Sequence, residues 1–162
     1  MDIAPLRLDT QVPPRSDEEI SAIVAHWDQL RGPSSLPKSG TIDPLELKPF
    51  LSRVFIIDGS TIDEMYLRLA GTSYRDLYGF EITGKKLTEL IPATQRPDLL
   101  EDYESCLSRA APVYHSGSMT WRANGGQVRY ERVLLPFGEA RQVDRILGFA
   151  VFFDSNDRKI LR

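Results

Sequence analysis

Few side chains in this sequence are suited to redox or metal chemistry. The 162 residues include one cysteine, Cys106, and two histidines, His26 and His115. Cys106 lies beside Tyr103 and Leu107 on the apolar side of a predicted helix, a position typical of a buried and unreactive thiol. Two isolated histidines and one cysteine match no metal-ligand spacing. The sequence therefore predicts neither a metal nor a cofactor.

The two histidines have ordinary structural interpretations. His115 falls in a predicted strand, on the same face as Met119 and Trp121. We expect it to be hydrogen-bonded or exposed rather than a ligand. His26 lies at the edge of the apolar side of a predicted helix, and we expect its ring in solvent.

Acid–base catalysis would need a carboxylate, alone or paired with a histidine, inside a cavity. The longest predicted helix of the central region carries four acidic residues: Asp98, Glu101, Asp102 and Glu104. They mostly avoid the apolar stripe of that helix. We therefore interpret them as a solvated surface and predict no enzymatic activity.

The charge balance bears on the class of partner. Twenty Lys and Arg against 23 Asp and Glu give a net charge of -3, which offers no broad positive field for nucleic acid or anionic lipid. The short basic groups at Lys85-Lys86 and 158–162 are interpreted as solvated charges. One cysteine leaves no internal disulfide, and no apolar run approaches about 18 residues. We expect a cytoplasmic protein that binds neither nucleic acid nor membrane.

The length fits one domain, preceded by a flexible arm over residues 1–15 that contains three prolines. Ser16 and Glu19 have the spacing of a capping box, and Gly32 ends the helical pattern. Between them, five apolar residues recur at helical intervals: Ile20, Ile23, Val24, Trp27 and Leu30. The pattern predicts an amphipathic capping helix within 16–32, whose stripe must be covered by its own chain or by another.

A polar connector over 33–51 precedes the core, which we place at 52–154. In the connector, Asp43 and Pro44 predict the start of a short helix that Pro49 ends. The core opens with two antiparallel strands, Val54–Ile57 and 65–70. Three helical patterns follow, the last and longest ended by Pro112: 72–79, 87–91 and 98–110.

The rest of the core predicts a three-stranded antiparallel meander. Strands over 113–122 and 127–137 flank the hairpin pair Asn124-Gly125, and a loop over 138–144 leads to a strand over 146–153. That last strand is apolar on both faces, so both sides of the sheet need cover. We predict an α+β fold, in which a five-stranded antiparallel sheet carries a block of short helices on one face and the N-terminal helix on the other. A short tail over 155–162 follows.

The order of elements and several motifs resemble those of PAS domains. The motifs are Trp27-x-x-Leu30-Arg31-Gly32, Arg68-Leu69-Ala70-Gly71-Thr72, Leu135-Pro136 and Ile146-Leu147-Gly148. Over residues 17–154 the chain is similar to a family of single-domain bacterial PAS proteins of unassigned function. The resemblance implies a stand-alone sensory or signalling module whose helices and sheet enclose a small core or a ligand cavity.

The same resemblance argues against two familiar PAS cofactors. Flavin photoreceptors carry a cysteine near the start of the helical block, where 72–76 has none. Haem-binding PAS domains usually take their axial histidine from the long helix, and this one contains no histidine. We expect the purified protein to be colourless.

The resemblance also indicates which residues would line a cavity and which partners to expect. The apolar and aromatic positions of the helical block and of the strand facing it are Tyr74, Leu77, Leu90, Tyr103, Leu107, Met119 and Trp121. We expect a homodimer that pairs through the N-terminal helix, and a separate signalling protein as a partner. The alternatives are an interaction module with a filled core, or a cone-shaped enzyme of the nuclear-transport-factor kind. The enzyme fold would need an N-terminal helical hairpin that this element order lacks.

Overall fold

The computed structural model describes residues 16–91, 94, 96–120 and 125–161. The arm expected over 1–15, and the turn residue Asn124, lie outside these residues. The helices are α1 (Glu18–Arg31), η2 (Ser39–Thr41), η3 (Lys48–Arg53), α2 (Thr72–Tyr78), α3 (Leu87–Leu90) and α4 (Pro97–Arg109). The strands are β1 (Val54–Asp58), β2 (Tyr66–Ala70), β3 (Val113–Thr120), β4 (Gln127–Glu139), β5 (Gln142–Phe153) and β6 (Lys159–Ile160).

One antiparallel sheet organises the molecule. Its strand order is β2-β1-β5-β4-β3, and the short β6 strand adds to β5. The β1 strand pairs with β5, although the two are far apart in the sequence, and Ile56 lies opposite Leu147. The predicted five-stranded antiparallel sheet of an α+β fold is confirmed, and β6 extends it.

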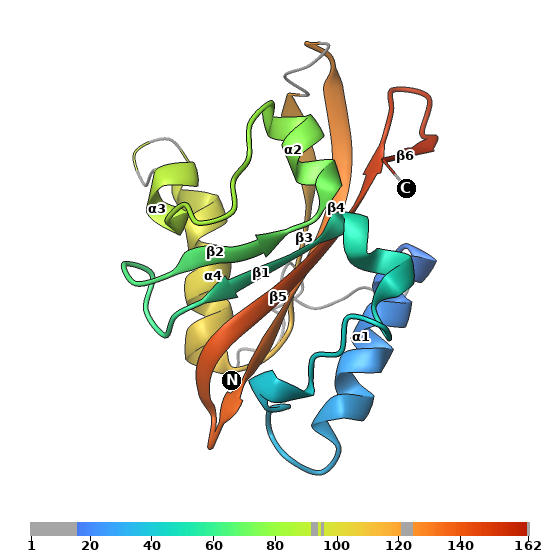
Figure 1. Cartoon of the computed structure of the whole chain (residues 1–162). Helices are drawn as coiled ribbons and strands as arrows, with labels where there is room; N and C mark the ends of the chain where they lie inside the picture. The colour runs from blue at the N-terminus through green and yellow to red at the C-terminus, as the bar shows by residue number, and fades with distance from the viewer. Residues whose placement is uncertain (1–15, 92–93, 95, 121–124, 162) are drawn as a thin grey trace, which may run out of the picture.

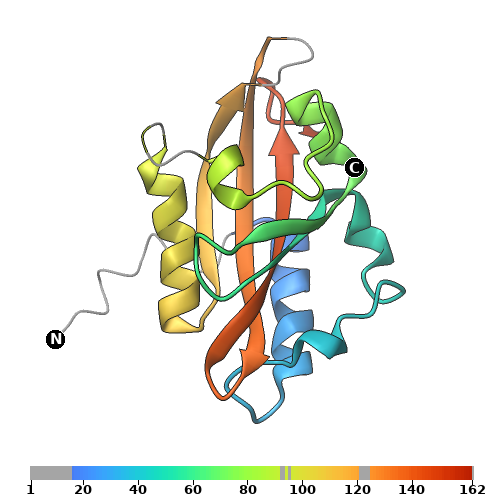
Figure 2. The same ribbon diagram turned by 60° about the vertical axis from the view of Figure 1, so that its left-hand side comes forward.

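The helices lie on the two faces that the sequence assigns to them. The α1 and α4 helices lie on opposite sides of the sheet (Figure 1). The turned view places α3 in front of the strands and α1 behind them (Figure 2). We call the face toward α4 the inner face and the face toward α1 the outer face. Both faces are apolar because each is a packing surface.

The α1 helix begins and ends at residues that suit its ends. The Asp17 side chain accepts a hydrogen bond from the Glu19 amide, so Asp17 rather than the expected Ser16 is the N-cap. Gly32 ends the helix with a φ of 58°, which glycine adopts without steric cost. Ile20, Ile23 and Trp27 of the predicted stripe are buried, and Val24 and Leu30 pack partly against the core.

The stripe is covered by the sheet of its own chain. The Trp27 indole Nε1 donates a 2.8 Å hydrogen bond to the backbone oxygen of Pro136 in β4. Apolar side chains of β4 and β5 lie around the Trp27 ring, among them Leu135 and Leu147. The helix therefore needs no second chain to bury its apolar residues.

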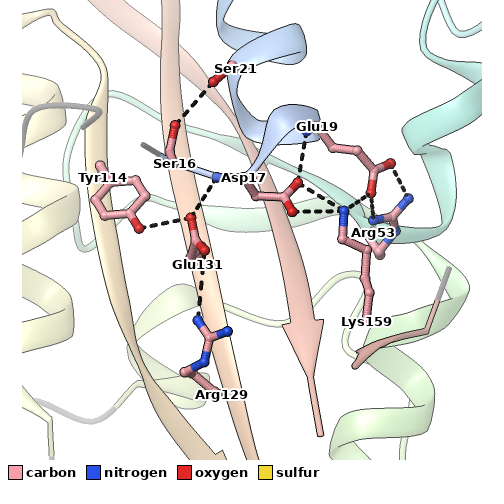
Figure 3. Close-up of polar contacts among 9 residues, drawn as sticks. All are labelled: Ser16, Asp17, Glu19, Ser21, Arg53, Tyr114, Arg129, Glu131 and Lys159. Carbon is pink, nitrogen blue, oxygen red and sulfur yellow. Dashed lines mark hydrogen bonds and ion pairs between the residues drawn. The ribbon is translucent and has the colours of Figure 1, made fainter. Parts of the chain in front are cut away.

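Polar contacts hold the first turn of α1 to the C-terminal strand (Figure 3). Lys159 of β6 forms ion pairs with Asp17 at 2.9 Å and with Glu19 at 2.8 Å. Arg53 donates two hydrogen bonds to the Glu19 carboxylate, at 2.9 and 2.8 Å. We call these four residues the α1 ion cluster. The interpretation of the basic tail as solvated charge is wrong for Lys159, whose side chain is only 13% exposed.

Two local predictions are also wrong. The chain makes turns after Asp43, and Pro49 lies in the first turn of the 3-10 helix η3 instead of ending a helix. The expected loop over 138–144 is a two-residue turn, Ala140 and Arg141, both with positive φ. The α4 helix ends at Arg109, with Ala110 as its left-handed C-cap two residues before Pro112, within one residue of the expected end.

Candidate ligand cavity

A cavity of about 240 Å³ lies between the helices α2, α3 and α4 and the inner face of the sheet. Most of its wall is apolar or aromatic. The lining residues are Phe55, Ile57, Leu67, Tyr74, Leu77, Tyr78, Ile82, Leu87, Leu90, Ile91, Arg96, Leu99, Tyr103, Met119, Tyr130, Arg132, Ala150 and Phe152. An apolar pocket with a few convergent polar groups is the usual form of a small-molecule site.

The structure brings five of the seven predicted wall residues to this cavity. They are Tyr74, Leu77, Leu90, Tyr103 and Met119. Leu107 does not line it, although the side chain packs partly against the core. Trp121 lies outside the residues that the structure describes. Their role in binding a ligand stays a prediction.

Local periodicity explains why these side chains meet. Tyr74, Leu77 and Tyr78 lie at helical spacing on α2, and Leu99 and Tyr103 do so on α4. Met119 reaches the same space from β3, because alternate residues of a strand share a face. Met119 therefore lies on the inner face of the sheet, as its place among the predicted wall residues requires.

Aromatic packing orders the part of the cavity wall that Phe55 and Tyr74 form. The Phe55 ring lies over Gly148, where a Cβ would come within 2.0 Å of the ring, so only glycine fits under it. Phe55 and Tyr74 pack edge to face with centroids 5.3 Å apart. The Tyr74 hydroxyl donates a 2.6 Å hydrogen bond to the Arg53 backbone oxygen, and burial raises its pKa well above the usual value. These residues give the cavity a fixed shape.

A buried ionic group stands where α4 meets the sheet. The Asp102 carboxylate on α4 accepts a 2.5 Å hydrogen bond from Nη2 of Arg132 on β4, and lies 3.2 Å from Nδ1 of His115 on β3. The Asp102 side chain is 14% exposed. The interpretation of Asp102 as solvated surface is therefore wrong, whereas Asp98, Glu101 and Glu104 are exposed as expected.

Charge and burial act in opposite directions on Asp102. Burial raises the pKa of its carboxyl, but the hydrogen bond from His115 and the charge of Arg132 outweigh burial and lower it. Asp102 thus stays ionised and balances Arg132. Helical spacing could have found Asp102, because it lies three residues after Leu99 and four before Cys106 on the buried side of α4.

Arg132 is a buried, charged residue of the cavity wall that sequence reasoning missed. It lines the cavity, its side chain is only 8% exposed, and its guanidinium carbon lies 5.6 Å from the centroid of the Tyr103 ring. Its Nε is buried without a hydrogen-bond partner among the described residues. Nothing in the sequence distinguishes Arg132 from the arginine at 129, whose side chain is 43% exposed.

Of the three residues first considered for redox or metal chemistry, Cys106 and His26 take no part in the Asp102 ion pairs. Cys106 is fully buried, and burial raises the pKa of its thiol. It is not among the cavity-lining residues. Nε2 of His26 is buried without a partner among the described residues, so the expectation of a solvated ring is wrong.

Comparison with known proteins agrees with this architecture. A family model described as "PAS domain" matches residues 7–151. The chain therefore belongs to the PAS domain family, whose members are generally sensory modules. A search of curated proteins finds no match.

Solved structures support the fold alone, because their sequence identities are low. The dark structure of the blue-light photoreceptor Aureochrome1 LOV is 12% identical, with a TM-score of 0.52, and covers 71% of this chain and 86% of that one. The light-state dimer of the fungal blue-light photoreceptor Vivid is 13% identical, with a TM-score of 0.50, and covers 87% of this chain and 98% of that one. Within the described residues, no helix is both long and apolar enough to cross a membrane.

Proposed function

We propose that this chain is a PAS module that binds a small molecule in the cavity and signals without catalysis. The observation that carries the proposal is the cavity itself, about 240 Å³ lined mainly by aromatic and apolar side chains. An interaction module with a filled core would leave no such space. The carboxylate and histidine beside it do not line the cavity: Asp102 is paired with both Arg132 and His115.

A thermal-shift screen with a library of small metabolites tests ligand binding. A ligand at 100 times its Kd stabilises the folded state by about 2.7 kcal/mol, a rise in Tm of roughly 5–10 °C for a domain of this size. Met119→Trp places a bulkier side chain at the cavity wall and fills part of the cavity, so it should abolish the rise in Tm. Tyr114→Phe, on the outer face of the same strand, should retain it. A library without any stabilising compound, or equal responses of the two variants, would contradict the proposal.

The proposal includes output through a separate signalling protein and through a homodimer. The stripe of α1 is buried in its own chain, so a dimer would use other surfaces than Ile20, Ile23 and Trp27. Light scattering at two protein concentrations measures the mass directly. A monomer at both would remove the homodimer from the proposal while leaving ligand binding in place.

A further inference from the structure

The inference concerns the ligand class and rests on the proposed function, because it assumes that the cavity is a binding site. Its starting point is the unused donor on Arg132. A buried guanidinium normally satisfies its N–H groups, since an unpaired buried donor is costly. Nη2 of Arg132 is paired with Asp102, while Nε has no partner among the described residues. Nε itself is sealed from the cavity, so a ligand acceptor meets the guanidinium through the 8% of the side chain that stays exposed, where a charge-assisted hydrogen bond is available.

The charges of the wall favour a negative acceptor. The described lining residues include two arginines, Arg96 and Arg132, and four tyrosines, but no Asp or Glu. The carboxylates that neutralise the arginines, Asp98 and Asp102, lie outside the lining. A ligand therefore meets the cationic side of each pair. In a space of low dielectric constant, this arrangement favours an anion over a cation.

The rest of the wall indicates that the other end of the ligand is apolar. Away from Arg132 and Arg96 the lining is aliphatic or aromatic, with residues such as Ile57, Leu87 and Phe152. That part of the wall offers no charged partner for a second ionised group at the far end of the ligand. The volume, about 240 Å³, is below the usual range of roughly 300–1,000 Å³ for ligand pockets, so the ligand must be small.

We propose that the cavity binds a small monocarboxylic acid with an apolar or aromatic body. The carboxylate accepts a hydrogen bond from the part of the Arg132 guanidinium that faces the cavity, with Arg96 adding positive charge nearby, and the body packs among the apolar side chains of α2, α3 and the sheet. Asp102 keeps the Arg132 guanidinium in place from the side of α4. Arg96, whose side chain is 45% exposed, is at the solvent side of the wall.

Matched probes separate this inference from the general proposal. The probes are 3-phenylpropionate, 3-phenylpropanamide and 3-phenylpropan-1-ol, with hexanoate and hexanamide as a second pair. Titration calorimetry gives each Kd. Methionine labelled with ¹³C at its methyl group reports the location, because Met119 lines the cavity whereas Met65 is fully buried outside the lining. Met119→Leu assigns the signal. We expect each acid to bind at least about tenfold more tightly than its amide or alcohol and to shift the Met119 signal.

The decisive variant removes the guanidinium without leaving a buried charge. Arg132→Met alone would strand the Asp102 carboxylate, so it is combined with Asp102→Asn. The double variant should bind the acid and the amide equally. Arg129→Gln is the matched control, because it removes one arginine from the outer face of the same strand. It should retain the tenfold preference.

Each outcome decides one of the two proposals. If neutral probes bind as well as acids and shift the Met119 signal, the cavity binds ligands but the carboxylate inference fails. If the acid preference persists in the double variant, or disappears in Arg129→Gln, Arg132 is not the recognition residue and the inference fails. If none of the probes shifts the Met119 signal at millimolar concentration, the inference fails, while the metabolite screen still decides on ligand binding.

Discussion

At the residue scale, Glu19 pairs with two basic residues from different parts of the chain. Its carboxylate joins α1 to η3 through Arg53 and to β6 through Lys159 (Figure 3). The hydrogen bonds from Arg53, and to a lesser extent that from Lys159, lower the pKa of Glu19 from 4.5 to about 2, against the opposing effect of burial. A carboxyl whose folded pKa is lowered stabilises the fold above its unfolded pKa.

The prediction for Glu19 concerns stability in acid. The contribution of this carboxylate is complete above a pH of about 4.5 and is lost as the pH falls toward about 2. The shift corresponds to about 3 kcal/mol at most, and solvent screening reduces it to on the order of 1–2 kcal/mol. Glu19→Gln should lower the free energy of unfolding by this amount at pH 7, and the difference from wild type should shrink toward pH 2. Urea unfolding at half-unit pH intervals measures it.

Glu18→Gln is the matched control, because Glu18 is exposed and lies in the same first turn of α1. Its effect should stay within the roughly 0.3–1 kcal/mol expected of a charge near a helix N-terminus. If Glu19→Gln and Glu18→Gln give the same pH profile, the α1 ion cluster has no special role.

Individual charged residues were the least predictable part of the sequence. Asp102 and Lys159 look like ordinary surface charges, yet each is buried against a partner far away in the chain, Arg132 and Asp17 respectively. Composition and spacing give the number of charges, but only the tertiary fold gives their pairs. The polar end of the cavity could not be inferred for that reason, whereas its apolar wall could.

At the element scale, Trp27 fixes α1 on the sheet through one ring and one hydrogen bond. Trp27→Phe retains most of the apolar contact but leaves the buried Pro136 oxygen without its donor. We expect a loss of about 1–3 kcal/mol in the free energy of unfolding. Trp27→Ala should cost about 3–5 kcal/mol, because it also creates a cavity. Chemical unfolding measures both losses.

The control on α1 is Gln29→Ala, at an exposed position, which should change stability by no more than about 0.5 kcal/mol. A dimer contact through Trp27 would instead show as a change in mass with little change in monomer stability. That result would contradict the intramolecular packing described for α1.

Elements with a clear period were predictable, and short irregular ones were not. The apolar repeats of α1 and α4 extend over three or more turns, and β5 contains a long continuous apolar run, so the pattern alone identifies these elements. The two residues of β6 carry no pattern and form a strand only because the edge of β5 accepts them. The turn at Ala140 and Arg141 was missed because neither residue is typical of positive φ.

At the scale of the whole molecule, the sheet separates two apolar compartments with different tasks. The outer compartment, where α1 meets β4 and β5, is densely filled. The inner compartment, between the sheet and α2, α3 and α4, keeps the cavity. The outer packing supports the strands from behind, so the shape of the cavity depends on a helix that does not touch it.

Deleting residues 1–32 tests this dependence. Without α1, the outer face of the sheet would expose large apolar residues that are now fully buried: Leu135, Phe137, Leu147 and Phe149. A patch of this kind favours aggregation, and Arg53 would lose its carboxylate partner Glu19. We expect an insoluble chain, or a soluble one that binds a hydrophobic dye and unfolds without a cooperative transition. Deleting only residues 1–15 leaves α1 intact and should keep solubility and Tm unchanged. A shorter chain, lacking 1–32, that stays soluble and unfolds at the same Tm as the full chain would show that the inner compartment is stable without α1.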